Sequence, residues 1–230
     1  MKRYLITGAS RGIGRAIAEQ LAAPDIFLFL HGRDEKALAL VAQLVRAKGA
    51  ETLCLMADLR DHDAVKRLAG EVQASPLDVL INNAGFAVVK PFDQISLEEW
   101  NALLSVNVTA PFLLTRRLAP RMASGSAIVN VLSIAAKTGF ANWSGYCMTK
   151  FALEGWSQSL REELRARSIR VLNVYPAATN TEIWNGVTGE WPREKMIVAG
   201  EIASAIGYAL SRPADVALEN ITLSSVRGTL

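Results

Sequence analysis

The stretch TGASRGIG, residues 7–14, carries three glycines in eight residues near the start of the chain. It follows an apolar run that predicts a strand, and it leads into a segment whose apolar residues recur at helical spacing. Gly8, Gly12 and Gly14 permit a tight turn and a close approach of the backbone to a phosphate, and the start of a helix offers free amides to such an anion. Because the spacing is G-x3-G-x-G rather than the common G-x-G-x-x-G, the motif alone leaves a plain structural turn open.

Strand-like apolar runs alternate with helical segments along the rest of the chain. The predicted strands are 3–7, 26–31, 52–58, 77–85, 126–133, 169–176 and 220–225. The predicted helices are 12–23, 35–49, 61–72, 96–122 (capped by Ser96 with Glu99, kinked at Pro111), 145–166 and 200–211, and 177–198 is irregular. This alternation predicts an α/β fold: one Rossmann-like, doubly wound domain over residues 1–230, with a seven-stranded, mostly parallel sheet and helices on both faces.

Composition excludes several classes of function. The 230 residues carry a net charge of only +3, and the basic residues are scattered, so we expect no nucleic-acid partner. Two cysteines, Cys54 and Cys147, are too few for a disulfide framework or a four-ligand zinc site, and with two histidines we expect no metal. We expect Cys54 to be a small core residue. No apolar run predicts a membrane helix, and MKRYLITG reads directly into a strand, so a cytoplasmic protein is expected.

The carboxyl ends of the predicted strands carry small and polar residues, and parallel sheets bind ligands at that edge. At the end of the second strand, Gly32 places no carboxylate against a 2′-phosphate, and Arg33 is suited to pair with one. Arg11 lies in the glycine turn and can approach the same group. These residues predict NADP rather than NAD. Asp34 remains an alternative as a ribose acceptor if the strand ends later.

A second group of residues suggests acid–base chemistry. Tyr146 and Lys150 are four residues apart on a predicted helix and therefore share one face. A free tyrosine titrates near ~10, and a neighbouring ammonium is expected to lower that pKa. Ser133, at the end of the fifth strand, is placed to polarise a substrate carbonyl.

Together these motifs resemble the short-chain dehydrogenases/reductases in their single-domain form, over nearly the whole chain. TGASRGIG matches the family's glycine motif, NNAG (82–85) its fourth-strand motif, and Ser133 with Y146-x3-K150 its catalytic signature, with twelve residues between serine and tyrosine. The resemblance implies hydride transfer between a nicotinamide and a carbonyl or alcohol carbon. Tyr146 is then the acid or base, Lys150 lowers its pKa and holds the nicotinamide ribose, Ser133 binds the substrate oxygen, and Asn107 holds a water that connects Lys150 to solvent.

The resemblance also implies the residues that contact NADP. Asp58 matches the acidic residue beside the adenine ring, and Thr181 matches the threonine on the carboxamide. The full expected set is Gly8, Ser10, Arg11, Gly12, Ile13, Gly14, Arg33, Asp58, Leu59, Asn83, Ala84, Gly85, Tyr146, Lys150, Pro176, Thr179 and Thr181. The chain departs from the family where Ala177 replaces the glycine after Pro176, so we expect a modified loop near the nicotinamide. It also ends in SSVRGTL instead of the family's usual ending, so tail-mediated subunit contacts do not follow from the resemblance.

The substrate is expected to be a small apolar carbonyl or alcohol compound, and the favoured function is that of a carbonyl reductase. The expected pocket residues are Phe86, Val88, Phe140, Trp143, Trp184 and Trp191. The last two belong to the segment 182–198, which is expected to form a short loop that covers the substrate. Similar family members pair through the helices that correspond to 96–122 and 145–166, which predicts a homodimer or homotetramer. The alternatives are a noncatalytic NADP-binding redox sensor or regulatory protein and, more weakly, an epimerase or dehydratase.

Overall fold

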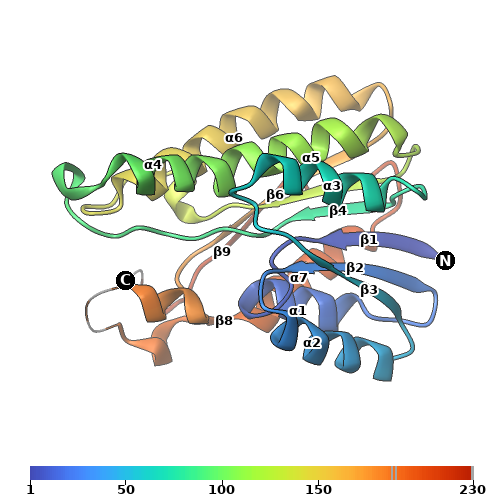
Figure 1. Ribbon diagram of the computed structural model, residues 1–230, viewed down its shortest axis with the longest axis horizontal. Helices are drawn as coiled ribbons and strands as arrows, with labels where there is room; N and C mark the ends of the chain where they lie inside the picture. Colours follow the sequence, from blue (N-terminus) through green and yellow to red (C-terminus); the bar gives the residue numbers. More distant parts are fainter. Residues whose placement is uncertain (188, 190, 229–230) are drawn as a thin grey trace.

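The computed structural model describes residues 1–187, 189 and 191–228. Over this part of the chain, seven parallel strands form one sheet in the order β3-β2-β1-β4-β5-β6-β9 (Figure 1). The strands are β1 (Lys2–Ile6), β2 (Ile26–Gly32), β3 (Glu51–Met56), β4 (Val79–Asn82), β5 (Ala127–Val131), β6 (Arg170–Pro176) and β9 (Asn220–Leu223). The predicted Rossmann-like α/β fold is confirmed. Because the strands are parallel, their carboxyl ends share one edge, opposite the N-terminus.

Helices cover both faces of the sheet. They are α1 (Gly12–Leu21), α2 (Glu35–Ala47), α3 (His62–Val72), α4 (Leu97–Leu104), α5 (Ala110–Leu118), α6 (Ser144–Arg165) and α7 (Ala199–Leu210). Figure 1 shows α1, α2 and α7 on one face and α3 to α6 on the other. Each layer has its own apolar core: Ile17, Val41 and Ile206 belong to the first, and Leu68 and Leu114 belong to the second.

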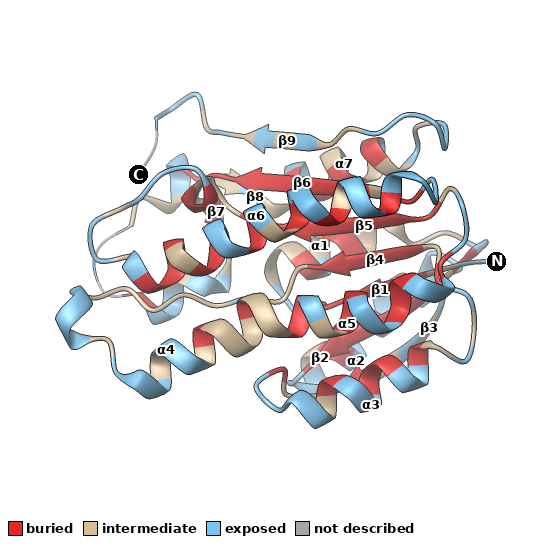
Figure 2. Cartoon of the chain, turned by 90° about the horizontal axis from the view of Figure 1, so that it is seen from above, coloured by how far each residue is buried: buried red, intermediate tan, exposed pale blue. Residues whose placement is uncertain are grey.

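The central strands are buried on both faces, as their uninterrupted apolar runs predict. Every residue of β4 and β5 is buried, and Figure 2 shows the buried strands running between the helix layers. The edge strand β9 alternates between exposed and half-buried residues instead. Cys54, on the other edge strand, is half-buried and packs against the core, as expected, and both cysteines are unpaired in the described chain.

Asparagines in register bridge four neighbouring strands. Asn82 pairs with Asn130, Asn130 with Asn173, and Asn173 with Asn220 along the sheet. The side chains of Asn82, Asn130 and Asn173 form a buried network, with Asn82 donating to Asn130 (2.9 Å) and Asn173 donating to Glu154 of α6 (3.2 Å). Buried amides of this kind are stable only when they are hydrogen-bonded, so the ladder fixes the strand register and ties α6 to the sheet.

The predicted helix 96–122 is helical from Leu97 to Leu118, but a π-helical turn interrupts its α geometry just before Pro111. The Ser96–Glu99 capping box is present at the start of α4. A π-helical turn, Ser105–Thr109, separates α4 from α5, and Pro111 lies in the first turn of α5, where its missing N–H is tolerated. The π turn contains Asn107, and such turns are frequent at functional sites.

The segment predicted as irregular contains short regular elements. Two-residue strands β7 (Thr179–Asn180) and β8 (Ile197–Val198) pair in parallel, and 3-10 turns cover Glu182–Gly186 and Arg193–Lys195. Thr188 and Glu190 of the predicted covering loop lie outside the described residues. Among the helices described, none combines the length and the apolar character needed to span a membrane.

Candidate active site

The glycine turn after β1 is shaped by backbone that side chains would block. Gly8 and Gly12 have φ values of +66° and +55°, a conformation that is strained for other residues. A Cβ on Gly14 would clash with the carbonyl oxygen of Gly8 and with the Asn83 amide. Helix α1 starts here, and its N-cap residue Arg11 makes no side-chain hydrogen bond to the first turn in the described chain. The amides at this helix end are therefore available to an anion.

The loop after β4 holds this turn in place. The Thr7 hydroxyl accepts hydrogen bonds from the amides of Asn83 and Ala84, both at 3.0 Å. The side-chain amide of Asn83 donates to the carbonyls of Thr7 (2.8 Å) and Gly8 (3.2 Å). Asn83, which we expected to contact the cofactor, therefore uses its side-chain amide to support the turn. Gly85 continues the loop toward Asn107 and Lys150.

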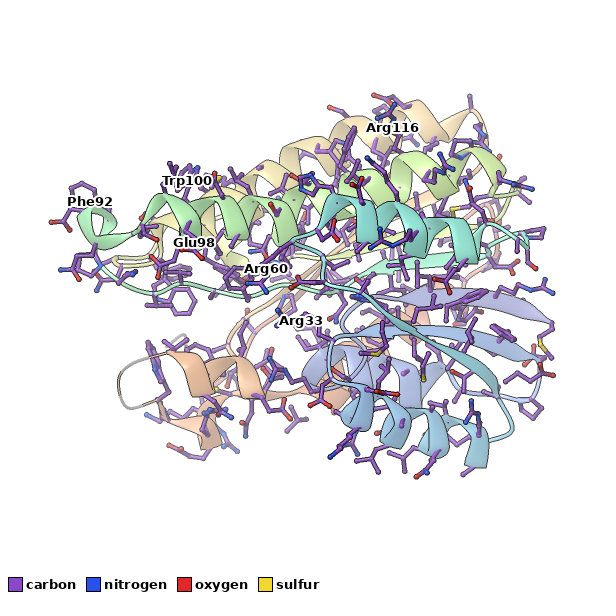
Figure 3. The ribbon with its side chains drawn as sticks, in the orientation of Figure 1. Arg33, Arg60, Phe92, Glu98, Trp100 and Arg116 are labelled. Atoms are coloured by element: carbon purple, nitrogen blue, oxygen red, sulfur yellow. The ribbon has the colours of Figure 1, made fainter. Side chains whose placement is uncertain are left out.

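The ends of β2 and β3 form an arginine-rich corner. A Cβ on Gly32 would lie 3.3 Å from that of Ser10, so the bare end of β2 packs against the glycine turn. Figure 3 shows Arg33 and Arg60 at this corner. Arg60 donates to both Asp58 oxygens through Nε (3.2 and 2.9 Å), and this hydrogen bonding lowers the pKa of the Asp58 carboxyl. No sequence motif singled out Arg60, although its position two residues after Asp58 could have indicated that the two side chains pair.

The carboxylate of Asp34, the alternative ribose acceptor, caps the start of α2. β2 ends at Gly32, one residue beyond the predicted end at His31, and Asp34 is the N-cap of α2. Its carboxylate accepts a hydrogen bond of 3.0 Å from the amide of Ala37. Leu59, also on the expected cofactor set, is buried beside this corner.

The structure brings Ser133, Tyr146 and Lys150 together at the carboxyl end of β5. Tyr146 and Lys150 are one turn apart on α6, and Ser133 follows β5 as the N-cap of a short 3-10 turn. Burial raises the pKa of Tyr146 to about 12, while a hydrogen bond with Ser133 acts in the opposite direction. The net lowering of this pKa that we expected from Lys150 is not found, because burial of the phenol dominates.

Lys150 is itself buried, with 4% of its surface exposed. Its ammonium donates to the carbonyl of Val131 (2.9 Å) and lies 5.6 Å from the centre of the Tyr146 ring. Burial lowers the pKa of Lys150 to about 8. Charge and phenol thus lie in one dry region at the end of β5, where an electrostatic interaction is stronger than in water.

Asn107 connects this region to the loop after β4. Its amide nitrogen donates to the Phe86 carbonyl (2.9 Å) and to the Thr149 hydroxyl (3.0 Å), and its oxygen accepts from the Phe86 amide (3.1 Å). The side chain thus ties the π turn to α6 and to the loop. A Cβ on Gly85 would lie 3.3 Å from Asn107 and 3.8 Å from the Lys150 nitrogen, so the glycine leaves room beside the ammonium.

An apolar cavity of about 370 Å³ opens beside Tyr146 and Ser133. Four of the expected pocket residues line it, namely Phe140, Trp143, Trp184 and Trp191. Phe86 and Val88 do not belong to the lining. The backbone of Phe86 is hydrogen-bonded to the Asn107 side chain instead. The lining also includes residues that sequence patterns did not mark: Leu132, Ile134, Ala135, Ala141, Ala178, Ile183 and Val187.

Three tryptophans form the aromatic wall of this cavity. The Trp143 ring centre lies 5.6 Å from that of Tyr146 and 5.8 Å from that of Trp184, and Trp184 lies 4.7 Å from Trp191. Tilted and edge-on contacts at these distances are favourable beyond simple burial. The indole of Trp184 also donates to the carbonyl of Thr179 (2.8 Å). The aromatic wall is therefore held beside the phenol.

The segment after β6 places the remaining expected residues. Pro176, Ala177, Thr179 and Thr181 line the cavity, as does Ile13 of α1. Ala177 avoids the left-handed region and donates from its amide to Leu223 of β9 (2.8 Å), so the chain passes this point without glycine.

Thr181 lies against the glycine turn, 3.2 Å from a Cβ placed on Gly12. Arg193, which no motif marked, forms several hydrogen bonds to residues 180–185. Arg193 donates to Asn180 (3.0 Å), to the Thr181 carbonyl (2.7 Å) and to Asn185 (2.9 Å). These bonds tie Arg193 to the start of the segment, whose Ile183 and Trp184 line the cavity.

Fold and site together define a nucleotide-binding α/β protein with an oxidoreductase-type tyrosine–lysine centre. The family model described as short chain dehydrogenase matches residues 2–190, and the chain belongs to this family of oxidoreductases. It is 35% identical to a D-threitol dehydrogenase of Mycolicibacterium smegmatis over 88% of this chain and 80% of the relative.

Two solved structures are similar over almost their full length. One is a short chain dehydrogenase from Burkholderia cenocepacia in complex with NADP, with a TM-score of 0.88, 29% identity and coverage of 97% of this chain and 96% of the other. The other is an alcohol dehydrogenase from Thermococcus sibiricus complexed with 5-hydroxy-NADP, with a TM-score of 0.91, 28% identity and coverage of 100% and 99%.

Proposed function

We propose that the protein is an NADP-dependent carbonyl reductase for apolar, aromatic or alicyclic ketones and aldehydes. The observation that carries the proposal is a buried Tyr146 that borders, together with Ser133, an aromatic-walled cavity. A phenol held in its protonated form is an acid that can deliver a proton to a developing alkoxide.

The described residues fit a dinucleotide. The bare backbone of Gly8, Gly12 and Gly14 leaves room for a pyrophosphate, and the free end of α1 faces it. Gly32 and Arg33, with Arg11, support NADP over NAD because they offer positive charge and no carboxylate beside a 2′-phosphate. The NADP complexes of the two solved relatives agree with this choice. When bound, the reduced nicotinamide supplies the hydride.

The chain's own groups then supply the proton and the polarisation. Ser133 and Tyr146 hydrogen-bond the substrate oxygen, and the Tyr146 proton moves to that oxygen as negative charge develops on it. Lys150 lies beside the phenol and stabilises the phenolate that remains, because the ammonium is buried at low dielectric. Asn107 positions the loop of Gly85 against Lys150 and so shapes the route by which the proton is restored.

The cavity lining indicates the substrate class. Its polar side chains are Ser133, Tyr146, Thr179 and Thr181, and the described lining contains no charged residue. An anionic substrate would lose its hydration there without an ion partner, which is unfavourable. An uncharged compound with an apolar or aromatic body is the better fit.

The proposal includes the organisation of the molecule. Residues 1–230 form a single cofactor-binding and catalytic domain, and 182–198 is a short covering segment. Exposed apolar side chains on α4 to α6, including Trp100, Phe112 and Phe151, support a homodimer or homotetramer built through these helices. The unpaired cysteines favour a cytoplasmic location.

The test is an NADPH-oxidation screen over uncharged aromatic and alicyclic ketones and aldehydes, with Tyr146→Phe beside the wild type. Tyr146→Phe should lose turnover by a factor of about 10³ or more, because the acid is removed, yet still bind NADPH as judged by nicotinamide fluorescence. Normal turnover in Tyr146→Phe would refute the mechanism. NADPH binding by the wild type without turnover on any carbonyl would favour a noncatalytic sensor.

A further inference from the structure

His31 is a buried histidine that the proposed reaction does not use. It lies next to last in β2 and is 2% exposed. Its Nδ1 is 3.2 Å from the amide nitrogen of Gly8, and its Nε2 is 3.1 Å from the carbonyl oxygen of Ala57. Its own carbonyl accepts from the amide of Ala9 (2.8 Å). One residue thus contacts the glycine turn and the loop after β3.

These contacts fix the form of the imidazole. The Gly8 amide can only donate, so Nδ1 must carry a lone pair, and Nε2 must carry the proton that Ala57 accepts. The ring is therefore neutral with its proton on Nε2. A protonated ring would place a second N–H against the Gly8 amide.

The topology explains why such a link matters. In the sheet, β2 lies between β1 and β3, so no ladder hydrogen bond connects the ends of β1 and β3 directly. The glycine turn follows β1, and Asp58, the expected adenine residue, follows β3. The His31 side chain spans the end of β2 and joins these two loops.

We propose that His31 is a positioning residue of the dinucleotide site, whose neutral imidazole sets the distance between the phosphate-binding turn at Gly8 and the adenine-binding loop at Ala57–Asp58. The inference rests on the NADP binding proposed above and adds a residue that governs cofactor affinity. It predicts that NADPH affinity declines in acid, when the imidazole gains its second proton.

The surroundings of His31 determine the pH at which the imidazole gains its second proton. Burial lowers the pKa of His31, the bond to Ala57 raises it, the Arg33 charge at the end of β2 lowers it, and the Asp58 charge from the loop after β3 raises it. Asp58 is itself paired with Arg60. The pKa of His31 therefore lies below its ordinary value, so the imidazole stays neutral at physiological pH and is protonated only in acid.

The test uses three variants. His31→Phe keeps an aromatic ring but removes both hydrogen bonds, and His31→Asn keeps an acceptor at the position of Nδ1. The chain's other histidine, His62, is exposed at the start of α3, and His62→Gln is the matched control. The readouts are the Kd for NADPH by nicotinamide fluorescence from about pH 5 to about pH 8, and thermal unfolding without cofactor.

At neutral pH, His31→Phe should bind NADPH about tenfold or more weakly, because two loop contacts are lost, and His31→Asn should recover part of the loss. His62→Gln should match the wild type. The 2′-phosphate also titrates in acid, near pH ~6. The tested quantity is therefore the extra acid weakening of the wild type relative to His31→Asn.

A merely structural role predicts a different result. If His31→Phe unfolds at lower temperature but binds NADPH with the wild-type Kd, the inference is wrong. If His31→Phe does not fold, His31→Asn decides: weaker binding with less acid dependence supports the inference, and an unchanged Kd and profile overturn it. A wild type that does not bind NADPH at all would instead refute the proposed function.

Discussion

Replacing Lys150 by Met should abolish turnover and yet stabilise the protein near neutral pH. Burial lowers the pKa of Lys150 from 10.5 to about 8, which means that the folded state disfavours the ammonium. At about 1.4 kcal/mol for each pKa unit, holding the charge costs roughly 3 kcal/mol at about pH 7. Met fills similar space without charge but leaves the Val131 carbonyl without its donor, a loss of about 1 kcal/mol. The net gain is about 2 kcal/mol.

The direction in which stability changes with pH shows whether the buried Lys150 charge is the cause. Between the folded pKa of about 8 and the unfolded pKa of 10.5, the unfolded chain binds more protons at this lysine than the folded chain, so wild-type stability rises with pH. The rise from about pH 7 to about pH 9.5 is about 2 kcal/mol, and Lys150→Met lacks it. The advantage of the variant should therefore disappear near about pH 9.5.

Urea unfolding of both proteins at the two pH values measures this difference, and NADPH oxidation measures the loss of activity. Lys36→Met, which removes an exposed lysine from α2, is the control for charge removal and should change neither quantity by more than about 0.5 kcal/mol. A variant that is less stable than the wild type at neutral pH, or a stability difference that does not vary with pH, would refute the reasoning.

Three further changes test other parts of the structure. Arg33→Ala should raise the Kd for NADPH about tenfold and leave that for NADH unchanged, and an equal effect on both would exclude a 2′-phosphate contact. Gly14→Ala should prevent NADPH binding and destabilise the fold, because the added Cβ meets the Gly8 carbonyl. The control is Gly70→Ala in α3, which has open space around it and should stabilise the protein by about 0.5–1 kcal/mol in thermal unfolding. Lys137→Met should destabilise by about 2 kcal/mol, since it leaves the buried Glu154 carboxylate without its cation (2.7 Å), and an unchanged urea midpoint would show that the remaining donors to Glu154 suffice.

Much of the site could be predicted because its residues sit at strand ends and at fixed helical spacing. Parallel strands bring their carboxyl ends to one edge, which places residues 8–14 and Ser133 at the same edge, and helical spacing places Tyr146 and Lys150 on one face of α6. Phe86 and Val88 were assigned to the pocket from nearness in sequence, but the loop after β4 turns toward Asn107 instead. The π turn at 105–109 was not predicted, because a proline such as Pro111 is visible in a sequence, whereas a π turn has no sequence signature.

The sequence by itself determined the fold class, the glycine turn and the tyrosine–lysine pair, because each depends on local periodicity or on residues a few positions apart. Only the tertiary structure decided the electrostatics. Burial raises the pKa of Tyr146 and lowers that of Lys150, against the expectation from the lysine's charge alone. The tertiary structure also decided the role of His31, whose partners lie 23 and 26 residues away on two other strands' loops. Desolvation and cross-strand contacts depend on the packing of distant segments, which local sequence does not encode.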